Sequence, residues 1–317
     1  MTGPRIWGKL SVKLFNSECR SKIAALSLRH KKMNKHLPRV ISDDQRLEFF
    51  RDGVVCLRDV FDEQWIELLK AGLQKNLNAP GARSRIYDRT DDDHFFLYDS
   101  DNWQQIPEYE EFVYQSPCAQ IAAELLEAES VHFFFEAVFF RSCGVTFPTP
   151  WHQDEPYWSV EGMDTVSIWK PLVPVEQQSA LAFVPGSHRW SNRYRQVDLA
   201  VLNPDGQEGV DTVSFEGDDW KPFPDIESNR DKYNVVSWEM APGDCAAFNG
   251  RIIHGGSGAL SSDRELRVFN TQWLGDDVRV RFKNHGMDPD HSDKMRLGGM
   301  QTGDQLNGDI YPRLPVT

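Results

Sequence analysis

Short apolar segments separated by turn signals dominate the chain from about residue 130 onward and restrict what it can fold into. This pattern is typical of antiparallel sheets, because their strands are about four to eight residues long and are joined by tight turns. The clearest turns are Pro185-Gly186-Ser187 and Pro242-Gly243-Asp244, since proline and glycine supply the backbone angles that turns need. We therefore predict that this half of the chain is all β. The expected strands cover residues 132–141, 164–170, 180–184, 234–239, 244–249 and 266–274.

The region before these strands is predicted to be mainly helical. Ser42 and Gln45 have the spacing of a capping box, in which each side chain bonds the backbone N–H of the other residue, and Gly53 ends the helix that follows. The folded part is therefore expected to begin near residue 41. The further elements expected here are a strand over 54–60, a helix with a 3.6-residue apolar period from Asp62, and a helix over much of 109–127.

The first 40 residues differ in composition from the rest. They hold ten Lys or Arg and one acid, Glu18, which leaves 25 basic and 47 acidic residues in the remainder. Mitochondrial transit segments and basic disordered arms share this composition. We interpret residues 1–40 as a basic N-terminal extension and residues 41–317 as a single domain.

Composition argues against several classes of protein. Of the 317 residues, 40% are hydrophobic and 26% charged, as in ordinary globular proteins, and the apolar runs are too short to cross a bilayer. A net charge of −13 disfavours binding to nucleic acid or to an anionic membrane. The five cysteines have no metal-binding spacing, so a cytoplasmic location is the default prediction, and mitochondria are the alternative if the N-terminus is a transit segment.

A metal site is suggested by His152 and Asp154, which follow a Phe-rich strand, and by His254, about a hundred residues further on. Residues i and i+2 of an extended strand project to the same side, so the first two can hold one ion together. Two imidazoles and one carboxylate on one face of an octahedral ion leave positions open for a cosubstrate and O2, as non-haem Fe(II) requires. We predict that these three residues bind iron.

The His-x-Asp spacing alone is weak evidence. His291-Ser292-Asp293 repeats it in a polar stretch without a later histidine, and we interpret this second pair as a solvated loop. Two alternatives apply to the first set: its pair could be a surface turn between two prolines, and His254 could be an interior histidine with its hydrogen bonds satisfied. The apolar strand that precedes the first pair favours a buried metal site.

Six blocks of the sequence resemble the phytanoyl-CoA dioxygenase family of Fe(II)- and 2-oxoglutarate-dependent oxygenases, over roughly residues 41–280. Their order and spacing are more specific than any single block. The resemblance implies a double-stranded β-helix, a cupin-like jelly roll with iron inside its open end, so the expected fold is mainly β with flanking N-terminal helices. The blocks are Phe49–Val55, Trp151–Trp158, Val184–Trp190, Gly243-Asp244, Ile253–Gly255 and Arg267–Asp277.

The resemblance assigns the metal ligands to His152, Asp154 and His254. It implies Fe(II), the cosubstrate 2-oxoglutarate and O2, with ascorbate as a helpful reductant. The implied reaction is hydroxylation of a small organic or acyl substrate with release of succinate and CO2. Halogenating relatives have a small residue in place of this carboxylate, so the presence of Asp154 favours oxygen transfer.

Three further residues are expected to contact 2-oxoglutarate. In the family, a basic residue that opens the strand after the distal histidine holds the far carboxylate with a fork of donors. Arg267 fits this position best, and Arg264 is the alternative. Trp169 lies where relatives often place a tryptophan near the cosubstrate. Arg141 stands where relatives often have a lysine that faces it, and the two cations are not interchangeable.

Two other functions remain open from the sequence. One is a catalytically silent double-stranded β-helix that binds a small molecule or partner, and the other is a metal-containing cupin enzyme that does not use 2-oxoglutarate. The polar stretch 189–233 is predicted to be a lid over the site, because segments of this length without regular structure are usually functional or disordered.

Overall fold

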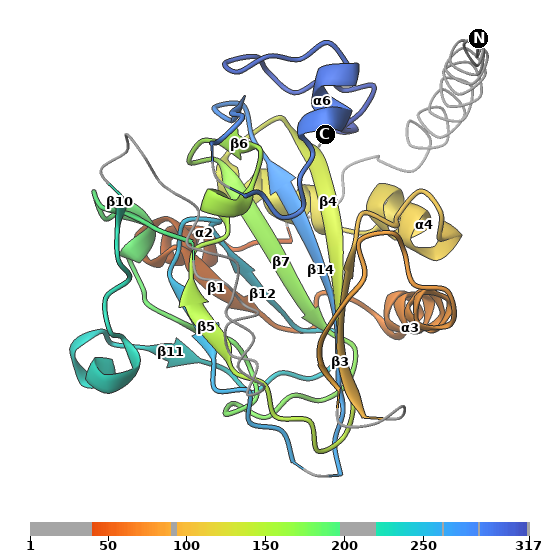
Figure 1. Cartoon of the computed structure of the whole chain (residues 1–317), viewed down its shortest axis with the longest axis vertical. Helices are drawn as coiled ribbons and strands as arrows, with labels where there is room; N and C mark the ends of the chain where they lie inside the picture. Colours follow the sequence, from red (N-terminus) through yellow and green to blue (C-terminus); the bar gives the residue numbers. More distant parts are fainter. Residues whose placement is uncertain (1–39, 90–93, 197–219, 262, 285, 316–317) are drawn as a thin grey trace, which may run out of the picture. The chain divides into compact units, whose positions relative to one another are not determined.

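Two β-sheets that face each other form the centre of the protein (Figure 1). The computed structural model describes residues 40–89, 94–196, 220–261, 263–284 and 286–315. The predicted extension therefore lies outside the described residues except for Val40, and so do residues 197–219 of the predicted lid. Both interpretations remain predictions.

The larger sheet has eight strands, and all its pairings are antiparallel. Its longest pairing joins β14 (Leu266–Leu274) and β4 (Ser130–Arg141), which lie side by side near the middle of the sheet (Figure 1). Along the sheet the strands are β1 (Val54–Leu57), β12 (Cys245–Phe248), β7 (Thr165–Pro171), β14, β4, β3 (Phe95–Ser100) and β2 (Arg85–Arg89), with β16 (Arg313–Pro315) paired to β4.

The smaller sheet has four short antiparallel strands. Two opposed antiparallel sheets confirm the predicted double-stranded β-helix. In sheet order the strands are β11 (Val236–Ser237), β8 (Ala182–Phe183), β13 (His254–Gly256) and β5 (Thr149–His152). Two further pairs lie outside these sheets: β6 (Val160–Glu161) with β15 (Arg279–Val280), and β9 (Arg193–Tyr194) with β10 (Trp220–Lys221).

The six strands predicted after residue 130 correspond to β4, β7, β8, β11, β12 and β14. The prediction that this half is all β is wrong in detail, because it also contains one short α-helix and three 3₁₀ helices among the described residues. These are α6 (Ser292–Leu297), η1 (Glu155–Tyr157), η2 (Ser187–Arg189) and η4 (Glu227–Lys232).

The first helix, α2 (Asp43–Asp52), forms as its sequence predicts. Ser42 and Gln45 make both hydrogen bonds of the capping box, and Gly53 ends the helix in the left-handed region at φ 78°. A β-carbon at Gly53 would also lie 2.3 Å from the ring of His188. This position therefore requires glycine for its backbone angle and for the close approach of the imidazole.

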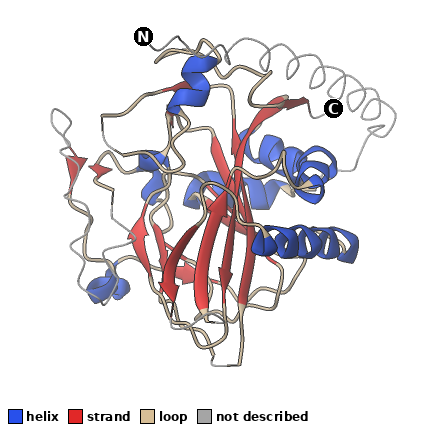
Figure 2. Cartoon of the chain, turned by 45° about the vertical axis from the view of Figure 1, so that its right-hand side comes forward, coloured by secondary structure: helices blue, strands red, loops and turns tan. Residues whose placement is uncertain are grey.

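Three helices cover the outer face of the larger sheet (Figure 2). They are α3 (Glu63–Asn78), α4 (Pro107–Gln115) and α5 (Cys118–Leu126). The helix expected across 109–127 is divided because Ser116 precedes Pro117 and has extended backbone angles. Phe269 of β14 packs against Tyr109 and Phe112 of α4, with ring centroids 4.6 and 5.5 Å apart.

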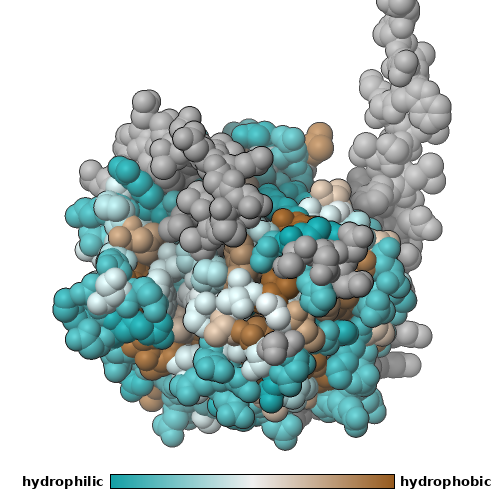
Figure 3. Space-filling view, turned by 60° about the horizontal axis from the view of Figure 1, so that its bottom comes forward, coloured by the Kyte–Doolittle hydropathy of each residue, from teal (hydrophilic) through white to brown (hydrophobic). Residues whose placement is uncertain are grey.

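On the face shown in Figure 3, hydrophilic residues form most of the visible surface and hydrophobic residues gather near the centre. Each helix that the structure describes falls short of the length and apolar character needed to span a membrane.

Candidate metal centre and cavity

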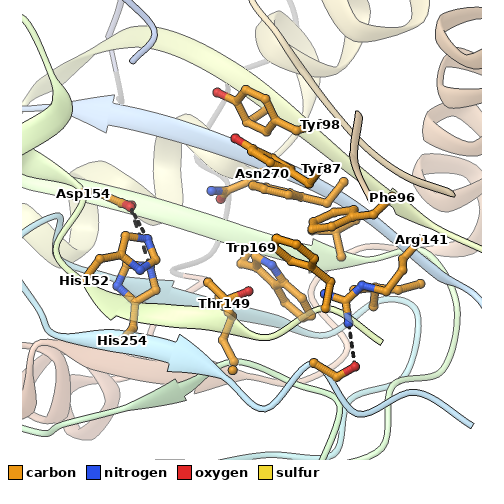
Figure 4. Close-up of a pocket in the computed structure, with 18 of the residues that line it drawn as sticks. Tyr87, Phe96, Tyr98, Arg141, Thr149, His152, Asp154, Trp169, His254 and Asn270 are labelled. Carbon is orange, nitrogen blue, oxygen red and sulfur yellow. Dashed lines mark hydrogen bonds and ion pairs between the residues drawn. The ribbon is translucent and has the colours of Figure 1, made fainter. Parts of the chain in front are cut away.

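His152, Asp154 and His254 come together between the two sheets (Figure 4). His254 begins β13 and lies directly opposite His152, the last residue of β5, in the antiparallel pairing of these strands. The two imidazole rings are therefore neighbours, with centroids 4.2 Å apart. Strand pairing explains how residues about a hundred positions apart meet at one point.

The expectation that His152 and Asp154 project from one extended strand is wrong. β5 ends at His152, and Asp154 has helical backbone angles (φ −75°, ψ −43°) at the start of η1. The N–H of Glu155 donates to the carbonyl of Gly250 at 2.8 Å and ties this turn to the loop that leads into β13. A strand end followed by a fixed turn, and not strand alternation, brings the carboxylate to the histidines.

The ligand atoms are spaced as a single ion requires. The Oδ1 atom of Asp154 lies 3.5 Å from Nε2 of His152 and 3.6 Å from Nε2 of His254, and all three atoms lie within 4.8 Å of one another. No other group of three or more potential ligands of this kind occurs in the described part of the chain. Two imidazoles and a carboxylate are the donor set of non-haem Fe(II) sites with open positions.

Hydrogen bonds on the far side of each ring fix the tautomers. Nδ1 of His152 lies 2.7 Å from the carbonyl oxygen of Pro150, and Nδ1 of His254 lies 3.1 Å from that of Ile252. A carbonyl can only accept, so each Nδ1 carries the proton and each Nε2 presents its lone pair to the centre. Both rings are thus oriented as metal ligands.

Burial and nearby charges favour neutral His254 and ionised Asp154, the protonation states in which both can bind a metal. Burial lowers the pKa of His254 to about 4, and the nearby His152 acts in the same direction. Burial alone would raise the pKa of Asp154, but His254, His152 and a hydrogen bond from Ser167 outweigh it and lower the pKa. The Oγ of Ser167 donates to Oδ2 of Asp154 at 3.2 Å, which leaves Oδ1 facing the histidines.

The centre lies at the wall of a cavity of about 150 Å3 between the sheets. Its floor is the inner face of the larger sheet, because alternate residues of paired strands point to the same side. From the smaller sheet come Thr149, Gly256 and the two ligand histidines. The floor residues are Leu266, Val268, Asn270 and Gln272 of β14, Phe135, Ala137, Phe139 and Arg141 of β4, and Trp169 of β7.

The structure separates the residues that were expected to contact 2-oxoglutarate. Trp169 and Arg141 line the cavity, and Trp169 lies between the metal ligands and Arg141 in Figure 4. Arg267 is not among the lining residues: it pairs with Glu265 at 2.6 Å and its guanidinium lies over the ring of Phe140. Arg264 is also outside the cavity and lies 3.4 Å from Glu176.

Arg141 is a buried cation with few partners. It is 4% exposed, its Nη1 donates to the carbonyl of Gly258 at 2.9 Å, and its guanidinium lies 4.8 Å from the ring centroid of Phe96. Its Nε has no hydrogen-bond partner, and among the described residues no carboxylate forms an ion pair with it. Burial lowers the pKa of Arg141 to about 10, so the group stays charged at neutral pH. An anionic ligand would satisfy it.

Two cavity residues were missed by sequence reasoning. Asn270 and Gln272 are 5% and 3% exposed, and their side-chain oxygens have no hydrogen-bond partner. Their signal in the sequence is a pair of amides two residues apart within an otherwise buried strand. Buried amides without partners are unfavourable unless a ligand or water completes their hydrogen bonds.

The second His-x-Asp pair is not a solvated loop, as was expected. His291 is fully buried, and its ring packs against Phe134 and Tyr311. Ser292 begins α6, and Asp293 alone of the three is exposed. The same spacing thus serves hydrophobic packing at one place and the metal centre at the other.

The sequence over residues 49–267 matches the family model described as phytanoyl-CoA dioxygenase. The chain belongs to the phytanoyl-CoA dioxygenase family. The match covers most of both sheets, including all three candidate ligands. The expected family relationship is therefore confirmed. No curated protein matches the chain.

Solved structures of similar fold include iron- and 2-oxoglutarate-dependent enzymes. The non-haem α-ketoglutarate-dependent carbocyclase SnoK from nogalamycin biosynthesis is 20% identical, with a TM-score of 0.63 over 86% of this chain and 96% of SnoK. The epimerase SnoN from the same biosynthesis is 18% identical, with a TM-score of 0.61 over 87% and 96%. EctD from S. alaskensis, solved with 2-oxoglutarate and 5-hydroxyectoine, is 18% identical, with a TM-score of 0.58 over 80% and 82%. These similarities show the fold that this family member shares with them.

Proposed function

We propose that this protein is an Fe(II)- and 2-oxoglutarate-dependent oxygenase that hydroxylates a small organic molecule and releases succinate and CO2. The observation that carries the proposal is the convergence of two imidazole nitrogens and one carboxylate oxygen within 4.8 Å, beside a cavity that also contains a buried guanidinium. Family membership supports it, as does the structure of SnoN in complex with Fe3+, α-ketoglutarate and nogalamycin RO.

His152, Asp154 and His254 would hold the iron. Their donor atoms fit it, because both Nε2 lone pairs and one carboxylate oxygen point to a common centre. Bound iron, with 2-oxoglutarate and O2, would supply the oxidising chemistry. The protein's own contribution is to fix the ligands through Pro150, Ile252 and Ser167, and to place the site in a cavity whose lining is mainly apolar.

Arg141 would hold the far carboxylate of 2-oxoglutarate in place of Arg267. Apart from the two ligand histidines, it is the only basic side chain among the described residues that line the cavity. It lies directly opposite Leu266, the first residue of β14, so its guanidinium leaves the sheet where this strand opens. A basic residue was expected at the start of β14, and Arg141 of the neighbouring strand β4 lies at the same level. A planar guanidinium with an unpartnered Nε can donate to a carboxylate.

Trp169 would bound the cosubstrate between the iron and Arg141. It pairs with Asn270 across β7 and β14, and both side chains line the cavity. The indole then forms an apolar wall beside the carbon chain of 2-oxoglutarate, and the Asn270 amide is available to a polar group near the metal.

Calorimetric titration of 2-oxoglutarate into the Mn(II)-loaded protein, together with assay of succinate in the Fe(II)-loaded protein under O2, tests this proposal. We expect binding that requires both metal and Arg141, so that Arg141→Gln weakens binding about a hundredfold and the matched variant Arg267→Gln does not. A product that gains one oxygen atom would identify hydroxylation. Succinate formation from 2-oxoglutarate alone, at a slow rate, would already support the cofactor assignment.

Other outcomes would identify the alternatives. Metal binding without any binding of 2-oxoglutarate would point to a cupin enzyme that does not use it. The absence of both metal and 2-oxoglutarate binding would indicate a catalytically silent member of the fold. If succinate is released but the product has gained no oxygen, the protein uses 2-oxoglutarate but does not hydroxylate its substrate. Ring closure or epimerisation, the activities named for SnoK and SnoN, would then be the reaction to test.

A further inference from the structure

One side of the cavity is a continuous wall of five aromatic rings, here called the aromatic wall. Tyr87 lies at its centre, with ring centroids 5.4 Å from Phe96, 6.0 Å from Tyr98 and 5.9 Å from Phe147. Phe139 extends the wall by packing 5.4 Å from Tyr98. All five rings line the cavity, and Figure 4 shows Tyr87, Phe96 and Tyr98 above Trp169 and Arg141.

These rings differ from aromatic residues in a packed core. A core ring has neighbours on both sides, whereas each ring of the aromatic wall borders open space in the cavity. Tyr87 and Phe139 are only partly buried despite their position among other aromatic side chains. Aromatic side chains that border open space bind flat apolar ligands well, because offset stacking and edge-to-face contacts add to the burial of apolar surface.

The polar groups near the metal are uncharged. Gln272 lies opposite Ser167 in the pairing of β14 with β7, and Ser167 is the residue that bonds Asp154. The Gln272 amide is therefore placed beside the metal centre, and its oxygen has no partner. An amide both donates and accepts, so it suits a hydroxyl or carbonyl group of a ligand.

The charged groups of the cavity already have partners or roles. His152, Asp154 and His254 form the metal centre, and Arg141 is assigned to 2-oxoglutarate. Asp288 also lines the cavity and forms an ion pair of 2.5 Å with Arg85. Among the described residues of the lining, no cation remains to bind a phosphate or carboxylate of the substrate. A charged substrate would enter without a counter-ion, which is strongly unfavourable in an apolar cavity.

We infer that the substrate is an uncharged molecule with a flat, ring-containing body that lies on the aromatic wall, and with a hydroxyl or carbonyl that bonds Gln272 near the metal. This inference rests on the proposed function, because it uses the assignment of Arg141 to 2-oxoglutarate. It disfavours acyl-CoA thioesters, whose several phosphates would need cations that the described cavity lacks.

Binding of four probes to the full-length protein, loaded with Mn(II) and 2-oxoglutarate, tests the inference. The probes are 2-naphthol, which is flat, neutral and carries a hydroxyl; naphthalene, which lacks the hydroxyl; 2-naphthoate, which is charged; and palmitoyl-CoA. We expect 2-naphthol to bind about tenfold more tightly than naphthalene and about a hundredfold more tightly than 2-naphthoate. Palmitoyl-CoA should not compete with 2-naphthol.

Variants assign the preference to the named residues. Gln272→Leu should remove the preference for 2-naphthol over naphthalene without weakening naphthalene, and Phe139→Ala should weaken both. The matched control Gln74→Leu, on the exposed side of α3, should change neither. Thermal unfolding confirms that each variant is folded. Tighter binding of 2-naphthoate or palmitoyl-CoA than of 2-naphthol, or an unchanged preference in Gln272→Leu, would overturn the inference.

Failure of the inference and failure of the proposed function give different results. If 2-oxoglutarate binds and succinate forms but the naphthalene series shows no preference, only the substrate class is wrong. If 2-oxoglutarate does not bind, the same series measured with the metal-loaded protein alone still reports whether the cavity prefers neutral rings. In that case 2-naphthoate should gain affinity through the unoccupied Arg141, and Arg141→Gln should remove this gain.

Discussion

Arg141 lies directly opposite Leu266 where β4 pairs with β14, and both side chains line the cavity. The next residue, Arg267, leaves the opposite face of β14 and pairs with Glu265. The basic residue expected at the opening of β14 is therefore replaced in the cavity by leucine, and the adjacent strand supplies the cation at the same level of the sheet.

An exchange of these two residues should restore what the single change removes. Arg141→Leu is expected to weaken binding of 2-oxoglutarate to the Mn(II)-loaded protein about a hundredfold, because a buried carboxylate loses its counter-ion. Leu266→Arg added to this variant should recover at least about tenfold, since it places a guanidinium at the paired position. Calorimetry measures both. Arg267→Leu is the control, and a loss of affinity there equal to that of Arg141→Leu would refute the assignment.

Ser167 is expected to tune the metal through Asp154. Its Oγ donates to Oδ2, so Ser167→Ala frees the carboxylate to rotate and leaves it less well oriented toward the two histidines. Loss of such a supporting hydrogen bond typically lowers metal affinity by about ten- to a hundredfold. Competition with a chelator measures this affinity. The control is Ser130→Ala, which removes a buried serine of β4 whose hydroxyl accepts a hydrogen bond from Arg313 of β16. It should leave metal affinity unchanged. Equal effects of the two substitutions would contradict the prediction.

The elements of the fold that are set by local interactions could be predicted from the sequence. The capping box at Ser42 and the glycine at Gly53 fix α2 without help from the rest of the chain. The break between α4 and α5 also had a signal, Pro117, but the apolar period continues across it and suggested one helix. Strands β8 and β11 are only two residues long although five or six were expected, because apolar composition does not say where pairing with a neighbour ends.

The three candidate metal ligands could be predicted to meet because two imidazoles and one carboxylate are the donor set that suits iron. The position of Arg267 outside the cavity could not be predicted, because the face of β14 that points inward depends on what packs against the strand. One face carries Leu266, Val268, Asn270 and Gln272, and the other carries Arg267, Phe269, Thr271 and Trp273. With Leu274, the first face has three apolar and two polar residues, and the second face has two of each, so both faces mix the two kinds. The choice is made by α4, which packs on Phe269 and so turns Arg267 away from the cavity.

The two His-x-Asp pairs should respond in opposite ways to the same substitution. His152→Ala removes a metal ligand at the cavity wall, so we expect loss of bound Fe(II) or Mn(II) with little change in the free energy of unfolding. His291→Ala removes a fully buried ring that packs against Phe134 and Tyr311, so it should cost roughly 2–4 kcal/mol of stability and leave the metal in place. Metal analysis and urea unfolding distinguish them, and loss of metal from folded His291→Ala would contradict the assignment.

Glu136 should make the stability of the protein depend on pH. It is fully buried on β4, its Oε1 accepts from the N–H of Asn102 at 2.6 Å, and its Oε2 has no partner. Burial raises the pKa of Glu136 from 4.5 to about 8. Between these values the folded state keeps a proton that the unfolded state releases, so this group makes stability fall as pH rises, by up to about 1.4 kcal/mol per pH unit.

Glu136→Gln removes this dependence, because the amide resembles the protonated carboxyl in shape and can still accept from Asn102. The variant should therefore gain stability relative to the native protein as pH rises from about 5 to about 8, and the gain should level off above that range. Urea unfolding across the range measures the difference in the free energy of unfolding between the two proteins. A difference that stays constant with pH would show that Glu136 is already ionised in the folded protein.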